Sequence, residues 1–140
     1  MTAPFARGRC LCGAVSYVIK AKPVRMVQCH CKDCQRSSGT GHISNALFRQ
    51  EDVEISGATS SYAVMADSGN TLTRHFCPVC GGRVYNFTTA RAGLISVTVG
   101  TLDDNSWFSP DAVLYIKRRA DWDITRMDVP NFEAMPPPVR

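Results

Sequence analysis

The sequence predicts a mainly β protein with short helical turns, and three observations support this fold class. Several short segments alternate large apolar residues with smaller or polar ones. In 13–19, for example, Val15, Tyr17 and Ile19 are separated by such neighbours. No segment of about 11 or more residues repeats its apolar residues with the helical period. Turn-forming residues also separate several of the segments, which is typical of antiparallel strands.

Taken in chain order, the segments with strand character are 13–19, 24–29, 42–48, 59–64, 71–76, 84–87, 94–99 and 112–116. Residues 31–38 are expected to form a short helical turn after a strand. The run Ser68-Gly69-Asn70 predicts a hairpin between 59–64 and 71–76, because Gly and Asn tolerate positive φ angles. The chain then becomes irregular, and we expect an extended, proline-rich tail over about 128–140, with Phe132 packed back on the domain.

The length of 140 residues predicts a single domain over 1–140. A second domain would leave each half too small to bury enough apolar surface. Hydrophobic residues make up 44% and charged residues 20% of the chain, so disordered and fibrous classes are excluded.

The charge pattern argues against a dedicated nucleic-acid binder. The net charge is +4, and the one dense basic run, Lys117-Arg118-Arg119, has only Tyr115 beside it as a stacking residue. No apolar stretch in the first residues predicts a secretory signal, and no segment approaches the roughly 20 residues of a membrane helix. We therefore expect a cytoplasmic protein without a membrane span.

The seven cysteines fall into three clusters, and none is isolated: Cys10 and Cys12; Cys29, Cys31 and Cys34; Cys77 and Cys80. Disulfides are disfavoured because the number is odd, Cys-x-Cys pairs bridge poorly and no secretory context is present. Buried free cysteines would be scattered rather than clustered. Redox chemistry at a Cys-x-x-Cys pair usually accompanies a βαβ unit, which the sequence does not predict.

Zinc explains the spacing better. A Cys-x-x-Cys turn points two thiolates at one ion, and Cys-x-Cys on a strand places both side chains on one face. Gly81 and Gly82 would let the backbone turn around the metal. Two pairs complete a tetrahedron, so a closed structural site is predicted from Cys10, Cys12, Cys77 and Cys80.

The central cluster supplies only three sulfurs, from Cys29, Cys31 and Cys34. Structural zinc sites are nearly always filled by four protein ligands, whereas catalytic sites keep one position for water or substrate. The three-cysteine pattern therefore predicts an open site. In the alternative, a further side chain closes it as a second structural site, and the candidates are His30, Asp33, His42 and His75.

The cysteine motifs read Gly-Arg-Cys-Leu-Cys-Gly-Ala-Val at 8–15, Cys-His-Cys-Lys-Asp-Cys-Gln-Arg-Ser-Ser-Gly at 29–39 and Phe-Cys-Pro-Val-Cys-Gly at 76–81. This pattern resembles the glutathione-dependent formaldehyde-activating enzyme family, which shares a zinc-bound β fold, the β-tent, with the Mss4-like proteins. Residues 100–104, Trp122, Pro130 and Phe132 also look like the family's closing stretch, so the resemblance covers roughly 7–135. It implies a zinc-binding core at about 7–125.

The resemblance implies two zinc ions: a structural one on Cys10, Cys12, Cys77 and Cys80, and a catalytic one on Cys29, Cys31 and Cys34. It implies a carbon–sulfur lyase whose partner is a glutathione-like thiol or a thiol–aldehyde adduct such as S-(hydroxymethyl)glutathione. His30, Asp33 and His42 are near the open site in sequence, but none is assigned as the general base. Arg36 and Lys32 could attract the carboxylates of a glutathione-like thiol.

A second function class remains open: a non-catalytic, zinc-stabilised binding module of the Mss4-like type. The chain is compact compared with fuller family members, and no segment is identifiable as a glutathione-binding insertion. The module would bind partners through an exposed β surface or the basic run at 117–119, and it predicts no turnover. The sequence indicates no oligomeric state.

Overall fold

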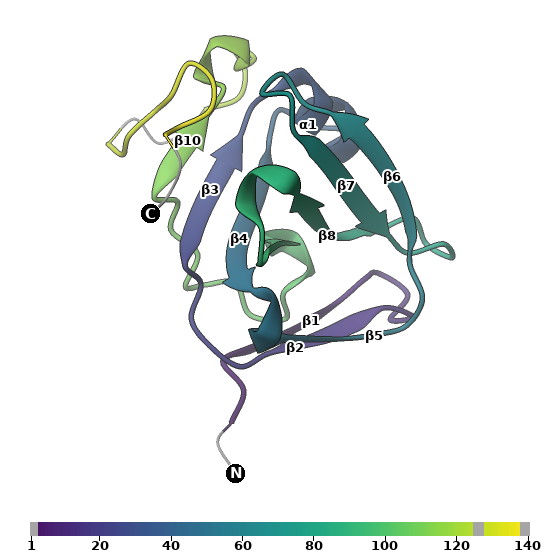
Figure 1. Ribbon diagram of the computed structural model, residues 1–140. Helices are drawn as coiled ribbons and strands as arrows, with labels where there is room; N and C mark the ends of the chain where they lie inside the picture. Colours follow the sequence, from purple (N-terminus) through teal and green to yellow (C-terminus); the bar gives the residue numbers. More distant parts are fainter. Residues whose placement is uncertain (1–2, 125–127, 138–140) are drawn as a thin grey trace.

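The computed structural model describes residues 3–124 and 128–137, whose strands form two sheets (Figure 1). The smaller sheet has the order β1-β2-β5, with β1 Ala6–Arg9, β2 Ser16–Ile19 and β5 Val53–Ser56. The larger sheet has the order β10-β3-β4-β9-β8-β7-β6, with β3 Arg25–Cys29, β4 Ile43–Arg49, β6 Ser60–Met65, β7 Thr71–Phe76, β8 Arg83–Thr88, β9 Leu94–Thr98 and β10 Ala112–Leu114. All pairings between these strands are antiparallel except that of β10 with β3.

The main core contains residues of both sheets. Phe48 on β4 lies opposite Ile95 on β9, and both are almost fully buried in one cluster with Tyr17 and Ile19 of β2. Because side chains alternate between the faces of a strand, the intervening residues of β4 and β9 face the other side of the sheet. That other side carries a second apolar cluster, which includes Val27, Leu47, Leu114, Cys29 and Cys34.

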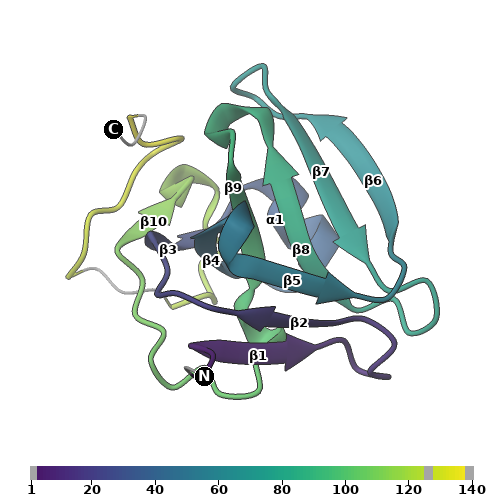
Figure 2. The same cartoon turned by 60° about the horizontal axis from the view of Figure 1, so that its bottom comes forward.

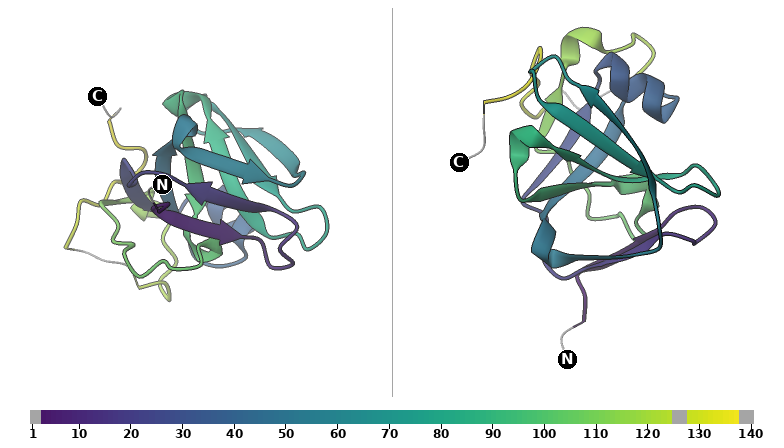
Figure 3. Two further views of the ribbon diagram at one scale, coloured as in Figure 1. Left: turned by 90° about the horizontal axis from the view of Figure 1, so that it is seen from below. Right: turned by 45° about the vertical axis from the view of Figure 1, so that its right-hand side comes forward.

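The single α-helix of the described residues, α1 Lys32–Ser38, lies far from the small sheet (Figures 1 and 3). Cys31 caps its N-terminus, since the Cys31 Sγ accepts a hydrogen bond from the Cys34 N–H at 3.3 Å. Gly39 ends the helix in the left-handed conformation, with φ of 77°. The remaining helical turns are short 3₁₀ segments: η1 Gln50–Asp52, η2 Thr89–Arg91, η3 Val99–Thr101 and η4 Ile116–Arg118.

The C-terminal segment pairs with β10 rather than extending freely (Figure 2). The Val113 N–H donates to the Pro130 carbonyl at 2.9 Å, and the Phe132 N–H donates to the Val113 carbonyl at 2.8 Å. Phe132 and Ala134 pack against the second apolar cluster. The expected packing of Phe132 is therefore confirmed for 128–137, whereas the rest of the expected tail, 138–140, lies outside the described residues.

The mainly β, Mss4-like class predicted from the sequence is confirmed, and each of the predicted strand segments contains a strand. Two short strands were missed, β1 and β5. The segment 112–116 is a strand only to Leu114, because Tyr115 turns into the left-handed region with φ of 56°. In 3–124 and 128–137, no helix combines the length and the apolar character needed to cross a membrane.

Candidate metal centres and the adjoining cavity

Cys10 and Cys12, in the turn after β1, meet Cys77 and Cys80, in the turn after β7. The Sγ atoms of Cys10 and Cys12 are 3.8 Å apart, those of Cys12 and Cys77 are 3.7 Å apart, and all four lie within 4.8 Å of one another. A tetrahedron with zinc–sulfur bonds of about 2.3 Å has edges of about 3.8 Å. The four sulfurs, called the closed cluster below, therefore fit one zinc ion.

Backbone N–H groups surround the sulfurs of the closed cluster. The Cys10 Sγ accepts from the Val15 N–H at 3.3 Å, and the Cys77 Sγ accepts from the Val79 N–H at 3.3 Å. Hydrogen bonds from the backbone N–H groups of Cys12 and Gly82 lower the pKa of the Cys80 thiol to about 6. N–H groups that point at sulfur stabilise thiolates, which are the form that binds metal.

Cys29, Cys31 and Cys34 form a separate group, called the open cluster below. Cys29 ends β3, Cys31 caps α1 and Cys34 lies in its first turn, so the strand-to-helix junction brings the three sulfurs within 4.8 Å. Hydrogen bonds from the Cys29 and Cys34 thiols hold the pKa of Cys31 well below its ordinary value. The cluster thus has one thiol that ionises readily, and divalent metal would displace the protons of the others.

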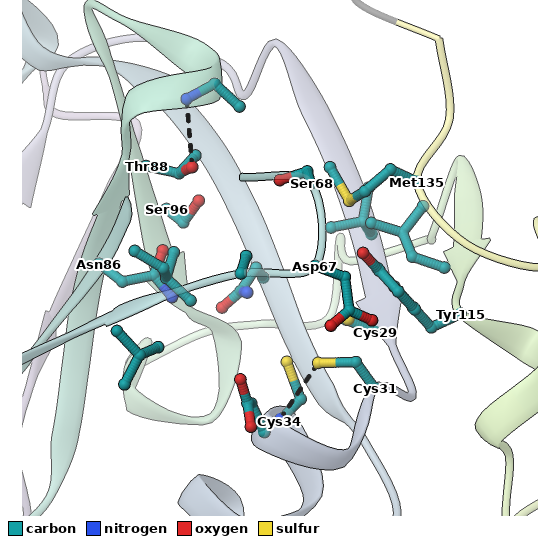
Figure 4. A pocket seen from close by; sticks show the side chains of 18 of the residues that line it. Cys29, Cys31, Cys34, Asp67, Ser68, Asn86, Thr88, Ser96, Tyr115 and Met135 are labelled. Carbon is teal, nitrogen blue, oxygen red and sulfur yellow. Dashed lines mark hydrogen bonds between the residues drawn. The ribbon is translucent and has the colours of Figure 1, made fainter. Parts of the chain in front are cut away.

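A cavity of about 240 Å³ adjoins the open cluster (Figure 4). The three cysteines lie at one end of it, Asn86, Thr88 and Ser96 lie on a wall formed by the large sheet, and Tyr115 and Met135 lie across from that wall. The turn between β6 and β7 contributes Asp67 and Ser68. A small molecule in this cavity would contact the sulfurs directly.

Tyr115 is the one non-glycine residue with positive φ in 3–124 and 128–137. Its side chain is buried and lines the cavity, and its hydroxyl forms no hydrogen bond within the described part of the chain. Burial raises the pKa of Tyr115, and the nearby Asp67 and cysteines add to that effect. The hydroxyl is therefore a neutral hydrogen-bond donor that faces the cavity. Strained backbone of this kind is often found at functional sites.

None of the residues that could have closed the open cluster joins it. His30 and His42 form a group with Asp123, in which the Asp123 Oδ2 lies 3.2 Å from the His30 Nδ1 and 2.6 Å from the His42 Nδ1. The His75 Nδ1 lies 3.0 Å from the Thr59 Oγ1. Asp33 lines the cavity without belonging to the sulfur group. Within the described residues, the open cluster thus has three donors, which leaves one tetrahedral position for another ligand.

Two arginines lie near the open cluster. Burial and the neighbouring charge of Arg74 lower the pKa of Arg83 to about 10, while the cysteines of the open cluster oppose that shift. Arg83 donates from Nη1 to the Ser37 Oγ at 2.6 Å, whereas Arg74 lines the cavity. Lys32 also lines the cavity, but Arg36 does not. Only Lys32 of the two cations considered from the sequence is therefore in a position to meet a ligand.

A mainly β domain that gathers four cysteines in one group and three in another, beside a cavity, defines a class of cysteine-rich proteins that could hold metal ions. The chain belongs to one family of that class, since the family model described as glutathione-dependent formaldehyde-activating enzyme matches residues 5–118. The family suggested by the cysteine motifs is thereby confirmed. No curated protein matches the chain.

Among solved structures, the chain is similar to the crystal structure of a Rhodobacter sphaeroides protein determined by a structural genomics programme. The TM-score is 0.56 at 22% sequence identity, over 69% of this chain and 87% of that one. This likeness supports the fold alone.

Sequence reasoning grouped the seven cysteines as the structure does, but it missed the cavity residues Arg74, Asn86 and Tyr115. Their signal was weak because each is a single residue inside an ordinary strand pattern or at a strand end. The one available hint was alternation: Arg74 and Asn86 occupy positions of β7 and β8 that share a sheet face with cavity residues.

Proposed function

We propose that the protein is a zinc-dependent carbon–sulfur lyase that makes and breaks the bond between a thiol and an aldehyde, as in S-(hydroxymethyl)glutathione. The observation that supports this proposal best is the placement of three sulfurs, without a fourth protein donor in the described residues, at the end of a cavity. Family membership supports the reaction class, because the family is described as glutathione-dependent and formaldehyde-activating.

Two zinc ions would be held by the chain. Cys10, Cys12, Cys77 and Cys80 would bind the structural ion, and the open cluster would bind the catalytic one. The catalytic ion would supply a position at which a thiol loses its proton at neutral pH. Three thiolate ligands favour a soft sulfur ligand, which suits thiol chemistry better than hydrolysis.

The cavity residues would orient the aldehyde and its adduct. In the condensation direction, the substrate sulfur forms a bond to the carbonyl carbon, the carbonyl electron pair moves to oxygen, and the oxygen takes up a proton. The Tyr115 hydroxyl, which faces the cavity, would donate a hydrogen bond to that oxygen as negative charge develops. In the reverse direction the carbon–sulfur bond breaks, the hydroxymethyl proton leaves and formaldehyde is released.

We place residues 1–140 in one domain, in which the closed cluster joins the turns after β1 and β7. A reducing compartment such as the cytoplasm would keep seven thiols available for metal. The non-catalytic binding module is the competing class, and the cavity next to the open cluster favours the enzyme.

To test the proposal, metal content and turnover are measured on the same protein. The reduced protein should contain two zinc ions, and glutathione should alter the thiolate absorption of the cobalt-substituted protein. At equilibrium between glutathione and ¹³C-formaldehyde, the protein should accelerate exchange between formaldehyde hydrate and the adduct, as measured by exchange NMR. The Cys31→Ser variant should not. Two metals without any response to thiols, and without faster exchange, would favour the binding module.

A further inference from the structure

Arg74 is a buried arginine that lines the cavity beside the sulfurs of the open cluster, and it has no hydrogen-bond partner in the described part of the chain. It is 6% exposed, it lines the cavity, and its Nε is buried without a hydrogen bond. Within 3–124 and 128–137, its guanidinium forms no hydrogen bond and no ion pair with a side chain. A charged group removed from water is stable only where an opposite charge or several acceptors meet it. Arg74 therefore indicates a ligand that supplies acceptors.

The strand register surrounds Arg74 with further polar groups. Arg74 on β7 lies directly opposite Asn86 on β8, and Asn86 lies opposite Ser96 on β9. All three line the cavity, so they form one polar row across three neighbouring strands. Asn45, which also lines the cavity, is 8% exposed and its Oδ1 has no hydrogen-bond partner. An ordinary sheet face packed on a core would carry apolar residues here.

The charges around the cavity favour an anion. The basic side chains that line it outnumber the acidic ones; they are Lys32, Arg74, Arg91 and Arg118, against Asp33 and Asp67. Neither aspartate forms an ion pair with Arg74 in the described part of the chain. The charge of Arg74 interacts with the sulfurs of Cys31 and Cys34, as does that of Arg83, but of the two arginines only Arg74 also lines the cavity. Arg74 is thus the buried cation available to a ligand.

We propose that Arg74 and Asn86 form a subsite for a carboxylate, so that the substrate of the open cluster is a thiol that carries a carboxylate within the same cavity. The planar guanidinium can donate two parallel N–H bonds to a planar carboxylate, and the Asn86 amide can donate a third. This inference rests on the proposed function for its thiol, and Arg74 determines specificity rather than taking part in the bond change.

The test compares two thiols of equal size that differ in one group, 3-mercaptopropionate and 3-mercaptopropionamide. Each is titrated into the cobalt-substituted protein, and affinity is read from the thiolate absorption. The wild-type protein should bind the carboxylate at least about tenfold more tightly than the amide, because charge-assisted hydrogen bonds are strong in a buried site. The Arg74→Gln variant should lose most of that preference.

A matched control removes the same charge elsewhere. Arg49 is exposed at the end of β4 and does not line the cavity, so Arg49→Gln should keep the preference. A loss of preference in both variants would assign it to the net charge of the protein and overturn the subsite. If Arg74→Gln does not fold, the wild-type comparison of the two thiols and the Asn86→Ala variant still decide the question.

The outcomes separate the subsite from the proposed function. Equal affinity of the wild-type protein for both thiols would overturn the subsite and leave the open cluster as a thiol site. If neither these two thiols nor glutathione changes the cobalt spectrum, the proposed function fails, and the subsite is then tested with succinate and succinamide by the ¹⁵N–¹H resonance of the Arg74 Nε. A shift with succinate alone supports the subsite, whereas no shift, or a stronger response to inorganic phosphate, overturns it.

Discussion

Cys29 and His30 are adjacent in the sequence, yet their side chains belong to different clusters. Cys29 lies with Cys31 and Cys34 beside the cavity, whereas His30 is fully buried with His42 and Asp123. Successive side chains of an extended segment point to opposite sides, so the end of β3 presents sulfur on one side and imidazole on the other. The carboxylate of Asp123 thus helps to hold the segment that carries the open cluster.

We expect Asp123→Asn to destabilise the protein by about 1–3 kcal/mol, because it weakens the contacts of a buried carboxylate with two imidazoles. The Asp123 Oδ2 lies 2.6 Å from the His42 Nδ1 and 3.2 Å from the His30 Nδ1. Urea denaturation of the zinc-loaded protein measures the change. Asp121→Asn, at an exposed position of the same segment, is the control and should change stability little. Equal stability of the two variants would show that the contacts of Asp123 with His30 and His42 do not stabilise the fold.

Local patterns predicted most of the fold, and the exceptions have physical causes. In β4 and β9, buried residues recur along the strand and several residues are β-branched or aromatic, so the strand can be predicted from the sequence. β1, with the sequence Ala-Arg-Gly-Arg, has no apolar alternation, and its strand character comes from pairing with β2. β5, with the sequence Val-Glu-Ile-Ser, does alternate apolar and polar residues, but its four residues are only half-buried or exposed and its pairing with β2 is visible only in the fold.

Of the candidate site, the cysteine clusters could be predicted from the sequence and the cavity could not. The cysteines were grouped from the sequence because metal ligands within one turn have fixed spacings, as in the Cys77–Cys80 pair. The cavity could not be predicted, because its residues come from strands that meet only through register. Arg74 and Asn86 are 12 positions apart in the chain and lie opposite each other only once β7 pairs with β8.

The two cysteine clusters should respond differently to the same substitution. Cys77→Ser should lose one zinc ion and the folded state, because the closed cluster joins distant turns and Cys77 is fully buried. Cys31→Ser should lose the other zinc ion and turnover while the protein stays folded, since Cys31 is only half-buried. Metal analysis and circular dichroism of both variants measure this. Unfolding of Cys31→Ser to the extent of Cys77→Ser would make the open cluster structural.

Graded removal of metal should proceed in two steps. With three protein donors and a cavity beside it, the open cluster should release its ion to a chelator first, and the fold should survive that loss. The second ion should leave only as the protein unfolds. Zinc release measured with a colorimetric chelator, alongside near-UV circular dichroism, separates the steps. Simultaneous loss of both ions and of the fold would contradict the division into a closed and an open site.

Tyr115→Phe tests the hydroxyl that faces the cavity. Removal of one hydrogen-bond donor to a developing oxyanion typically lowers kcat by about a hundredfold or more, so we expect a large loss of kcat in the exchange of formaldehyde with its thiol adduct. The KM for the thiol should change little, because the hydroxyl is expected to contact the aldehyde oxygen and not the sulfur. Exchange NMR at several thiol concentrations gives both quantities.

The Tyr115→Phe variant keeps the aromatic ring, so zinc content and thermal stability should remain close to those of the wild-type protein. Tyr62→Phe, which removes a hydroxyl from a side chain that is 67% exposed on β6, is the matched control and should leave kcat unchanged. A rise in KM at constant kcat would place Tyr115 in thiol binding. If the Tyr115→Phe variant has wild-type kinetics, the hydroxyl has no catalytic role. The left-handed conformation of Tyr115, with φ of 56°, would then serve only to end β10 and begin η4.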